Sequence, residues 1–351
     1  MKLLIVFAAG ALLPAAAWAQ QGQVNIICSV QADWCNLIQT VFAKSTGIKV
    51  NMTLKGSGEA LAQLIAEKAN PKTDVWFGGT GDPHLQAAEQ DLSLEYKSAA
   101  LKDLHGWAQA QAAQSGYKTV GIYSGPLGFG YNTELIAKKK IGIPKSWADL
   151  LKPEYKGQVA LAGDPRKSSQ AINAVYAAGL ANGGSLDDAT KGLDFFTQLN
   201  KAGNFVPVIA KPATIAKGET PIAIRWDYNA LANRDASNGN PTIEVVVPKS
   251  GVLAGTYVQA ISAFAPHPNA AKLWMEYLYS DEGQNIWLKG YAHPIRFADM
   301  VKRNVIPADL MKKLPDAAGY ANAAFPTNDQ LTTSKKTITE GWDKMVGADV
   351  K

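Results

Sequence analysis

Residues 225–228 of this 351-residue sequence place a cation, an indole, a carboxylate and a phenol directly after the apolar residues 222–224. Arg225 offers a planar fork for a carboxylate or phosphonate, and Asp227 can accept hydrogen bonds from an ammonium group. Trp226 or Tyr228 can give a cation an aromatic face. Alternation along an extended chain would put these two rings on the side opposite to the charged pair. We expect part of this group to bind a ligand. The alternative is an Arg225–Asp227 ion pair at a strand end with Trp226 in the core.

Three loops of small residues point to a second kind of chemistry, the binding of an anion. Each follows a predicted strand and precedes a predicted helix, at residues 56–58, 78–81 and 164–169. The N–H groups and the dipole of a helix N-terminus favour an anion. The alternative is that Ser57 and either Ser168 or Ser169 are only helix N-caps. Three loops in one chain predict a shared anion site, with candidate hydroxyls at Ser57, Thr80, Ser168 and Ser169.

Sequence motifs of common enzyme classes are absent. The chain contains no G-x-S-x-G, no H-E-x-x-H, no phosphate-binding P-loop motif and no dinucleotide fingerprint after a strand. The four histidines are scattered along the chain, at His84, His105, His267 and His293. We therefore expect a protein that is not an enzyme and that holds no cofactor and no metal. A secreted hydrolase with a site assembled from distant residues is kept as an alternative.

The N-terminus predicts export. Lys2 precedes an apolar stretch from Leu3 to Leu13, and residues 17–19 form an A-x-A cleavage site. We expect a signal peptide at residues 1–19 and a mature protein in the periplasm.

Cys28 and Cys35 are seven positions apart, and in an oxidising compartment they predict a disulfide, with free thiols as the alternative.

The charge balance is mild and does not indicate a nucleic-acid partner. Lysine and arginine number 35 against 30 acidic residues, for a net charge of +5. The sequence has no run of five or more basic residues and no interleaving of basic and aromatic residues that would follow a phosphate backbone. We expect a small-molecule ligand and no nucleic acid.

The elements that must position these residues follow an α/β pattern. Strands predicted at residues 24–28, 48–52 and 73–77 alternate with helices of 3.6-residue period. A glycine-rich break at 124–128 is typical of a crossover or a hinge between two extended segments. Farther on, Asn269 is a predicted helix N-cap. Two α/β units joined by extended crossings would enclose a cleft, and ligands of such sheets bind at the carboxyl ends of strands.

Several stretches resemble the periplasmic solute-binding proteins of ABC importers: residues 42–50, 66–71, 74–76, 131–135, 268–274 and 280–284. The branch that they resemble is the extracellular solute-binding protein family 1 type, with its ferric-iron, polyamine and 2-aminoethylphosphonate receptors. The resemblance implies a two-lobed periplasmic-binding-protein fold of type II. Each lobe would be a mixed, mostly parallel sheet flanked by helices, with a hinge of extended crossings. We expect lobe 1 over 24–124 and 259–305, and lobe 2 over 125–258 and 306–351.

The resemblance also implies how such a receptor works. It would be a monomer that closes on its solute and is recognised by an ABC permease in the inner membrane. The iron receptors of this branch hold ferric ion with two adjacent tyrosines, and the matching place here is Asp227 and Tyr228. Because one tyrosine remains, a ferric-iron receptor is the alternative function.

Other members of the branch suggest an organic solute. Polyamine and aminobutyrate-like receptors hold an amine with a Trp and an Asp, which Trp226 and Asp227 resemble. Ser168 and Ser169 match a position where several relatives bind an anionic group, and Tyr257 is a further candidate in the second lobe. We expect an amine-containing zwitterion, similar to an amino acid, an aminophosphonate or a polyamine. Its anionic group would lie near Arg225 or the loop donors.

Overall fold

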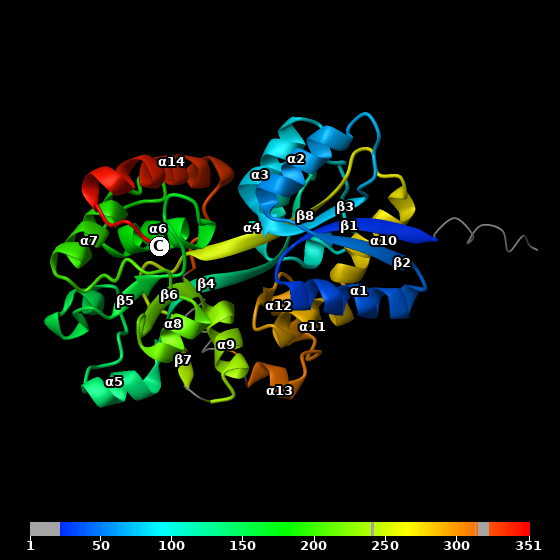
Figure 1. The fold of residues 1–351 in the computed structure, drawn as a ribbon. Coiled ribbons are helices and arrows are strands. Elements are labelled where there is room, and N and C mark those ends of the chain that lie inside the picture. Colours follow the sequence, from blue (N-terminus) through cyan, green and yellow to red (C-terminus); the bar gives the residue numbers. More distant parts are fainter. Residues whose placement is uncertain (1–21, 240–241, 313, 315–322) are drawn as a thin grey trace, which may run out of the picture.

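The computed structural model describes residues 22–239, 242–312, 314 and 323–351, so the predicted signal peptide lies outside the described residues. The described residues form two lobes, each a β-sheet flanked by helices, and long strands run from one lobe to the other (Figure 1). The predicted α/β class is confirmed. A search of these residues for a helix long and apolar enough to cross a membrane finds none.

Parallel strands form the sheet of the first lobe. Its strands β1 (Gln23–Ser29), β2 (Lys49–Leu54) and β3 (Val75–Thr80) pair in the order β2-β1-β3. A helix follows each strand at its carboxyl end: α1 (Ala32–Thr46), α2 (Ser57–Glu67) and α3 (Gly81–Glu89). The N-termini of α2 and α3 therefore lie at the same edge of the sheet. The remaining elements here are α4 (Gly106–Gln114), α10 (Pro268–Leu278), α11 (Asp281–Lys289), β9 (His293–Pro294), α12 (Phe297–Lys302) and α13 (Ala308–Met311).

The second lobe combines a smaller sheet with the end of the chain. Strands β5 (Val159–Leu161) and β6 (Ile222–Trp226) are parallel, and β7 (Ile243–Val246) pairs with the long strand β4. Helix α6 (Ser169–Ala181) packs against α7 (Thr190–Lys201) and α14 (Asn328–Met345), which lie together in Figure 1. The other helices of this lobe are α5 (Thr133–Lys139), α8 (Pro212–Lys217) and α9 (Asp227–Ala236).

Two long strands, β4 (Val120–Asn132) and β8 (Ala254–Ile261), connect the lobes (Figure 1). The first half of β4 pairs with β8, and its second half pairs with β6. The predicted interruption of the strand at 124–128 was wrong, because β4 runs through it, but the segment is a crossover between the lobes as predicted. Its glycines provide close packing instead: a Cβ at Gly125 would lie 2.4 Å from the Tyr228 ring, and one at Gly130 would lie 2.9 Å from the Ala230 Cβ.

Two local predictions need correction. Strand β6 ends at Trp226 and helix α9 begins at Asp227, so the expected alternation does not continue through Asp227 and Tyr228. The Trp226 amide N–H donates to the Gln170 Oε1 at 2.7 Å, which draws this end of the strand to α6. Helix α10 begins at Pro268 rather than after Asn269, because proline fits the first helical position.

The predicted disulfide between Cys28 and Cys35 is present. It links the end of β1 to α1, and both residues are buried in a hydrophobic core that extends through both lobes. The bond therefore fixes the segment that contains Ser29, next to the start of the cleft.

Candidate functional site

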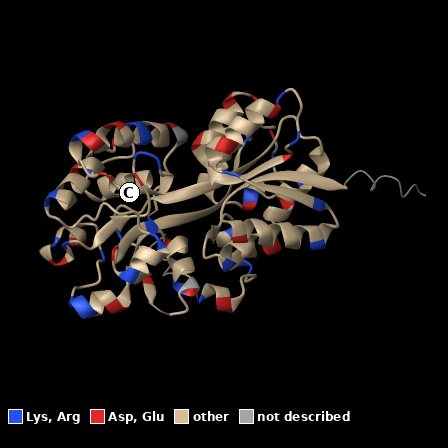
Figure 2. Ribbon diagram, viewed as in Figure 1, with Lys and Arg blue, Asp and Glu red and all other residues tan. Residues whose placement is uncertain are grey.

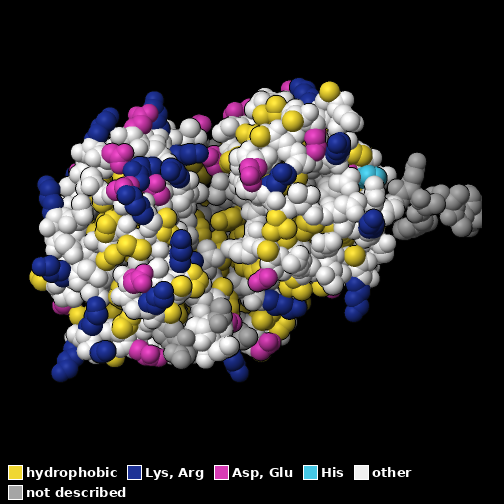
Figure 3. Space-filling model, in the orientation of Figure 1, with side chains coloured by type: hydrophobic (Ala, Val, Ile, Leu, Met, Phe, Trp, Pro, Cys, Tyr) yellow, Lys and Arg dark blue, Asp and Glu magenta, His cyan; other side chains and the backbone are white. Residues whose placement is uncertain are grey.

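A cavity of about 460 Å³ lies where the two lobes meet at the carboxyl ends of β1, β3 and β6. The space-filling view shows a hollow between the lobes (Figure 3). Residues of both lobes and of β8 line the cavity, and its volume is in the range of small-molecule sites. Its wall brings together five of the predicted site residues: Ser57, Thr80, Ser169, Trp226 and Tyr257.

Three helices begin at this wall. Ser57 is the first residue of α2, Thr80 immediately precedes α3, and Ser169 is the first residue of α6. In the described structure, neither Gly56 before α2 nor Thr80 before α3 accepts a side-chain hydrogen bond from the first turn of its helix. The N–H groups at the start of these two helices, together with three helix dipoles, favour an anion in the cavity.

The charged side chains of the wall add to this preference. Lys167 and Lys335 line the cavity, against one carboxylate in the described wall, Asp82. Lys335 Nζ lies 2.9 Å from Asp82 Oδ2, and Thr80 Oγ1 donates to Asp82 Oδ1 at 2.8 Å. Figure 2 shows that charged residues lie mostly on the helices and that few stand on the crossing strands. The two wall lysines therefore contribute a local excess of positive charge.

Gly79 brings two side chains of the cavity wall close together. Its φ is +88°, a left-handed conformation, and a Cβ there would lie 2.4 Å from the Ser57 Oγ. The same Cβ would lie 3.4 Å from that of Ser29, which also lines the cavity. Gly79 thus holds two hydroxyl side chains together at one point of the wall.

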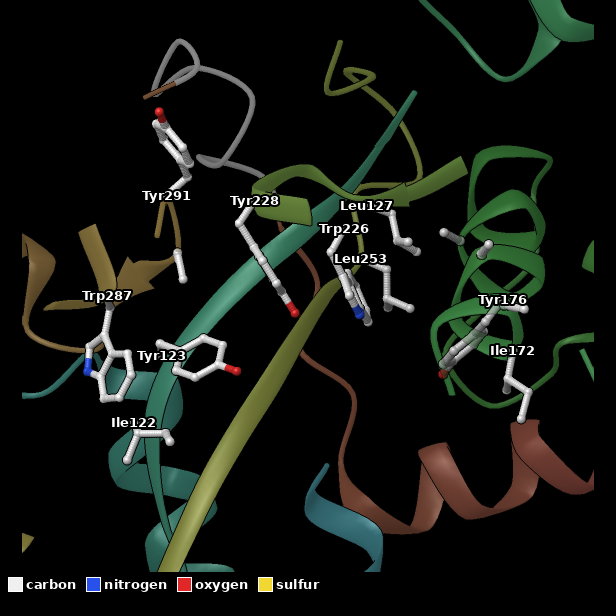
Figure 4. Packing of buried hydrophobic residues seen from close by; sticks show 14 of the residues in the cluster. Ile122, Tyr123, Leu127, Ile172, Tyr176, Trp226, Tyr228, Leu253, Trp287 and Tyr291 are labelled. Carbon is white, nitrogen blue, oxygen red and sulfur yellow. The ribbon is translucent and has the colours of Figure 1, made fainter. Parts of the chain in front are cut away.

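Another part of the wall is apolar. Trp226 is 2% exposed, and a Cβ at Gly255 would lie 2.6 Å from its indole Cη2, so the ring packs closely against β8. Ile172 and Leu331 line the cavity as well. Figure 4 shows Trp226 in the packed region between β8 and α6. The cavity therefore pairs a polar end with an aromatic and aliphatic end.

Ser168 and Arg225 lie outside this wall. The Ser168 hydroxyl accepts from the Ala171 amide at 3.4 Å as the N-cap of α6, which was the structural alternative for this residue. The Arg225 side chain leaves β6 on the side opposite to Trp226, and its Cδ comes within 3.8 Å of the Cβ position at Gly130. Burial lowers the pKa of Arg225 to about 10. Its Nε and Nη1 have no hydrogen-bond partner in the described structure.

Asp227 and Tyr228 also lie outside the wall, at the start of α9. Asp227 is fully buried, with its Oδ1 2.9 Å from the Cβ position at Gly125. Figure 4 shows the Tyr228 ring pointing toward Tyr123, and the ring centroids are 6.0 Å apart. Burial raises the pKa of Tyr228 well above its usual range, as does the neighbouring Tyr257, so the phenol is protonated at neutral pH.

Comparison with known proteins identifies the family. Residues 70–319 match the model of a bacterial extracellular solute-binding protein. The chain belongs to this family. An uncharacterized protein of Haemophilus influenzae is 35% identical over 276 residues, which are 77% of each chain. The solved structure of the periplasmic binding protein AfuA from Actinobacillus pleuropneumoniae, with exogenous fructose-6-phosphate bound, has a TM-score of 0.71 and 27% identity. It covers 93% of this chain and 99% of that one. The Escherichia coli sulfate-binding protein is 29% identical over 185 residues, which are 49% of this chain and 54% of that one.

The family explains the two-lobed fold of this solute-binding protein, and its members deliver a solute to the membrane permease of an ABC transporter.

Sequence reasoning missed several wall residues of the cavity: Ser29, Asp82, Lys167, Asn173 and Lys335. Lys167 directly precedes the predicted Ser168, so the small-residue loop at 164–169 could have pointed to this lysine as well. Lys335 gave none, since only the packing of α14 brings it to the cavity.

Proposed function

We propose that this protein is the periplasmic receptor of an ABC importer for a small organic anion, with phosphate esters as the first solute class. One observation carries the proposal: the N-termini of α2, α3 and α6 and two lysines meet at one cavity. Relatives add support, because the AfuA structure holds fructose-6-phosphate and another relative is a sulfate-binding protein. Both ligands present anionic oxygens that helix N-termini bind well.

Of the zwitterion predicted from the sequence, the proposal retains the anionic group and not the ammonium group. The anionic group would bind at Ser57, Ser169 and the first N–H groups of α3, because the Thr80 hydroxyl already donates to Asp82. The expected ammonium partner, Asp227, is not part of the cavity wall. Asp82 is the acidic residue in the described wall, and it is already paired with Lys335. A polyamine would meet two lysines and three positive helix ends, which disfavours it.

Binding would act on the hinge. The anion would contact α2 and α3 from the first lobe and α6 and Lys167 from the second, so its affinity for the closed state would exceed that for the open state. The crossing strands β4 and β8 would bend between the lobes. The expected lobes are 24–124 with 259–305 and 125–258 with 306–351, with one change: because Leu310 packs with Leu288 and Met300, we assign α13 to the first lobe. A permease would recognise the closed receptor, a periplasmic monomer.

A thermal-shift panel on the mature protein tests the proposal. The anions are fructose 6-phosphate, sulfate, inorganic phosphate and 2-aminoethylphosphonate; spermidine, ferric citrate and fructose are the comparison compounds. A solute at 100 times its Kd stabilises the fold by about 2.7 kcal/mol. We expect at least one anion to raise Tm and fructose to leave it unchanged. A shift by spermidine or ferric citrate with none from the anions would overturn the proposal. Ethylphosphonate beside 2-aminoethylphosphonate shows whether the amine contributes.

A further inference from the structure

Two buried aromatic rings lie behind the wall of the cavity without lining it. Trp76 of β3 and His84 of α3 stack with ring centroids 3.6 Å apart and an interplanar angle of 17°. Trp76 is 1% exposed and His84 is fully buried. Each ring makes one hydrogen bond toward a wall segment, and the two segments are Ser29 and the loop at 78–80.

Trp76 determines what the Ser29 hydroxyl can do. The indole Nε1 donates to the Ser29 Oγ at 2.9 Å, and an indole N–H can only donate. The hydroxyl oxygen is therefore the acceptor, and its own hydrogen is left to donate elsewhere. The described residues provide no hydrogen-bond acceptor for it, and Ser29 lines the cavity. Ser29 thus presents an O–H donor toward the space where the solute binds.

His84 fixes the neighbouring loop. Its Nε2 lies 2.8 Å from the Gly78 carbonyl oxygen, and because a carbonyl only accepts, Nε2 carries the hydrogen. Burial lowers the pKa of His84 to about 4, so the ring is neutral at neutral pH. Gly78 has a φ of +81° and precedes Gly79 and Thr80, which both line the cavity. The His84 bond therefore holds the loop in the conformation that brings these residues to the wall.

We infer that Trp76 and His84 act together as a positioning pair that makes Ser29 a hydrogen-bond donor to the anionic group of the solute. Neither ring touches the solute. The inference rests on the proposed function, since it assigns a donor to the anion of that site. It also implies selectivity, because a hydroxyl oriented as a donor favours an ionised acceptor over a group that must itself donate.

Calorimetric titration with fructose 6-phosphate tests the pair. Trp76→Phe keeps the stacked ring and removes the N–H, and we expect Kd to rise about fivefold to tenfold, as for the loss of one hydrogen bond. Ser29→Ala should raise Kd to a similar extent. The double variant should bind no more weakly than Ser29→Ala alone, because Trp76 acts through the hydroxyl. Trp274→Phe is the matched control: it removes another buried indole, whose Nε1 has no hydrogen-bond partner in the described structure.

The outcomes separate the two claims. Wild-type protein that binds none of fructose 6-phosphate, sulfate, phosphate and 2-aminoethylphosphonate overturns the proposed function and this inference with it. Wild-type binding with Trp76→Phe unaffected, or with additive effects of the two substitutions, overturns the inference alone. If Trp76→Phe does not fold, ¹⁵N spectra of the wild-type protein give a second measurement. The indole N–H resonance of Trp76 is identified as the one that moves in Ser29→Ala. It should shift on titration with fructose 6-phosphate, and an unchanged resonance contradicts the pair.

Discussion

The Lys335 Nζ lies 2.9 Å from the Asp82 Oδ2, so one ion pair joins α14 of the second lobe to α3 of the first at the edge of the cavity. The two side chains are 52% and 17% exposed, and an ion pair of this kind contributes at most about 1 kcal/mol. It is too weak to close the lobes alone. Its main effect is to hold a cation beside the helix N-termini.

Lys335→Met should weaken anion binding. Loss of one of the two wall cations removes about 1 kcal/mol of attraction, which corresponds to about a fivefold rise in the Kd for fructose 6-phosphate. The wild-type Kd should also rise with salt concentration, and less steeply in the variant. Lys336→Met is the control, because the adjacent lysine is exposed and lies outside the wall. Equal calorimetric effects of the two substitutions would contradict the role given to Lys335.

Gly79→Ala should abolish measurable solute binding while the protein still folds. The added Cβ would meet the Ser57 Oγ at 2.4 Å, and the φ of +88° is strained for alanine. Gly58→Ala is the control in the same wall, since its Cβ would meet nothing within 4 Å. Circular dichroism and calorimetry on both variants check this, and a Gly79→Ala protein with wild-type affinity would argue against the assigned wall.

His84 should make stability depend on pH. Burial lowers its folded-state pKa from 6.5 to about 4. Between these values the unfolded chain binds a proton that the folded chain does not, so the free energy of unfolding falls as pH is lowered through this window. This contribution is complete above pH 6.5, and its slope is at most about 1.4 kcal/mol per pH unit. Urea unfolding at pH 7 and pH 5 should show a smaller loss for His84→Phe than for wild type. Equal losses would refute the assignment.

Sequence reasoning located the wall hydroxyls better than the charged groups. Ser57, Thr80 and Ser169 follow from local signals, because a small-residue loop between a strand and a helix places its hydroxyl at the helix N-terminus. That Arg225 and Asp227 lie outside the cavity wall could not be predicted in this way. The end of β6 depends on Gln170, which is 56 positions away in the chain. The α/β class and the crossings followed from the alternation of elements, but the continuity of β4 depends on how tightly α9 packs onto its glycines.

Removal of the disulfide should lower stability without changing the fold. A loop of this length stabilises a protein by about 2–3 kcal/mol in the chain-entropy model. We expect the Cys28→Ala, Cys35→Ala double variant to lose about that much free energy of unfolding in urea. Dithiothreitol should lower the Tm of the wild type and leave that of the variant unchanged. A wild-type Tm that does not respond to reduction would contradict a stabilising role for the bond.

The position of a bound anion tests the central claim most directly. A crystal structure of the mature protein with fructose 6-phosphate should show the phosphate within hydrogen-bond distance of Ser57, Ser169 and the first N–H groups of α3, with the lobes closed around it. Density for the phosphate beside Arg225, or a solute held only by Asp227 and Tyr228, would contradict the account.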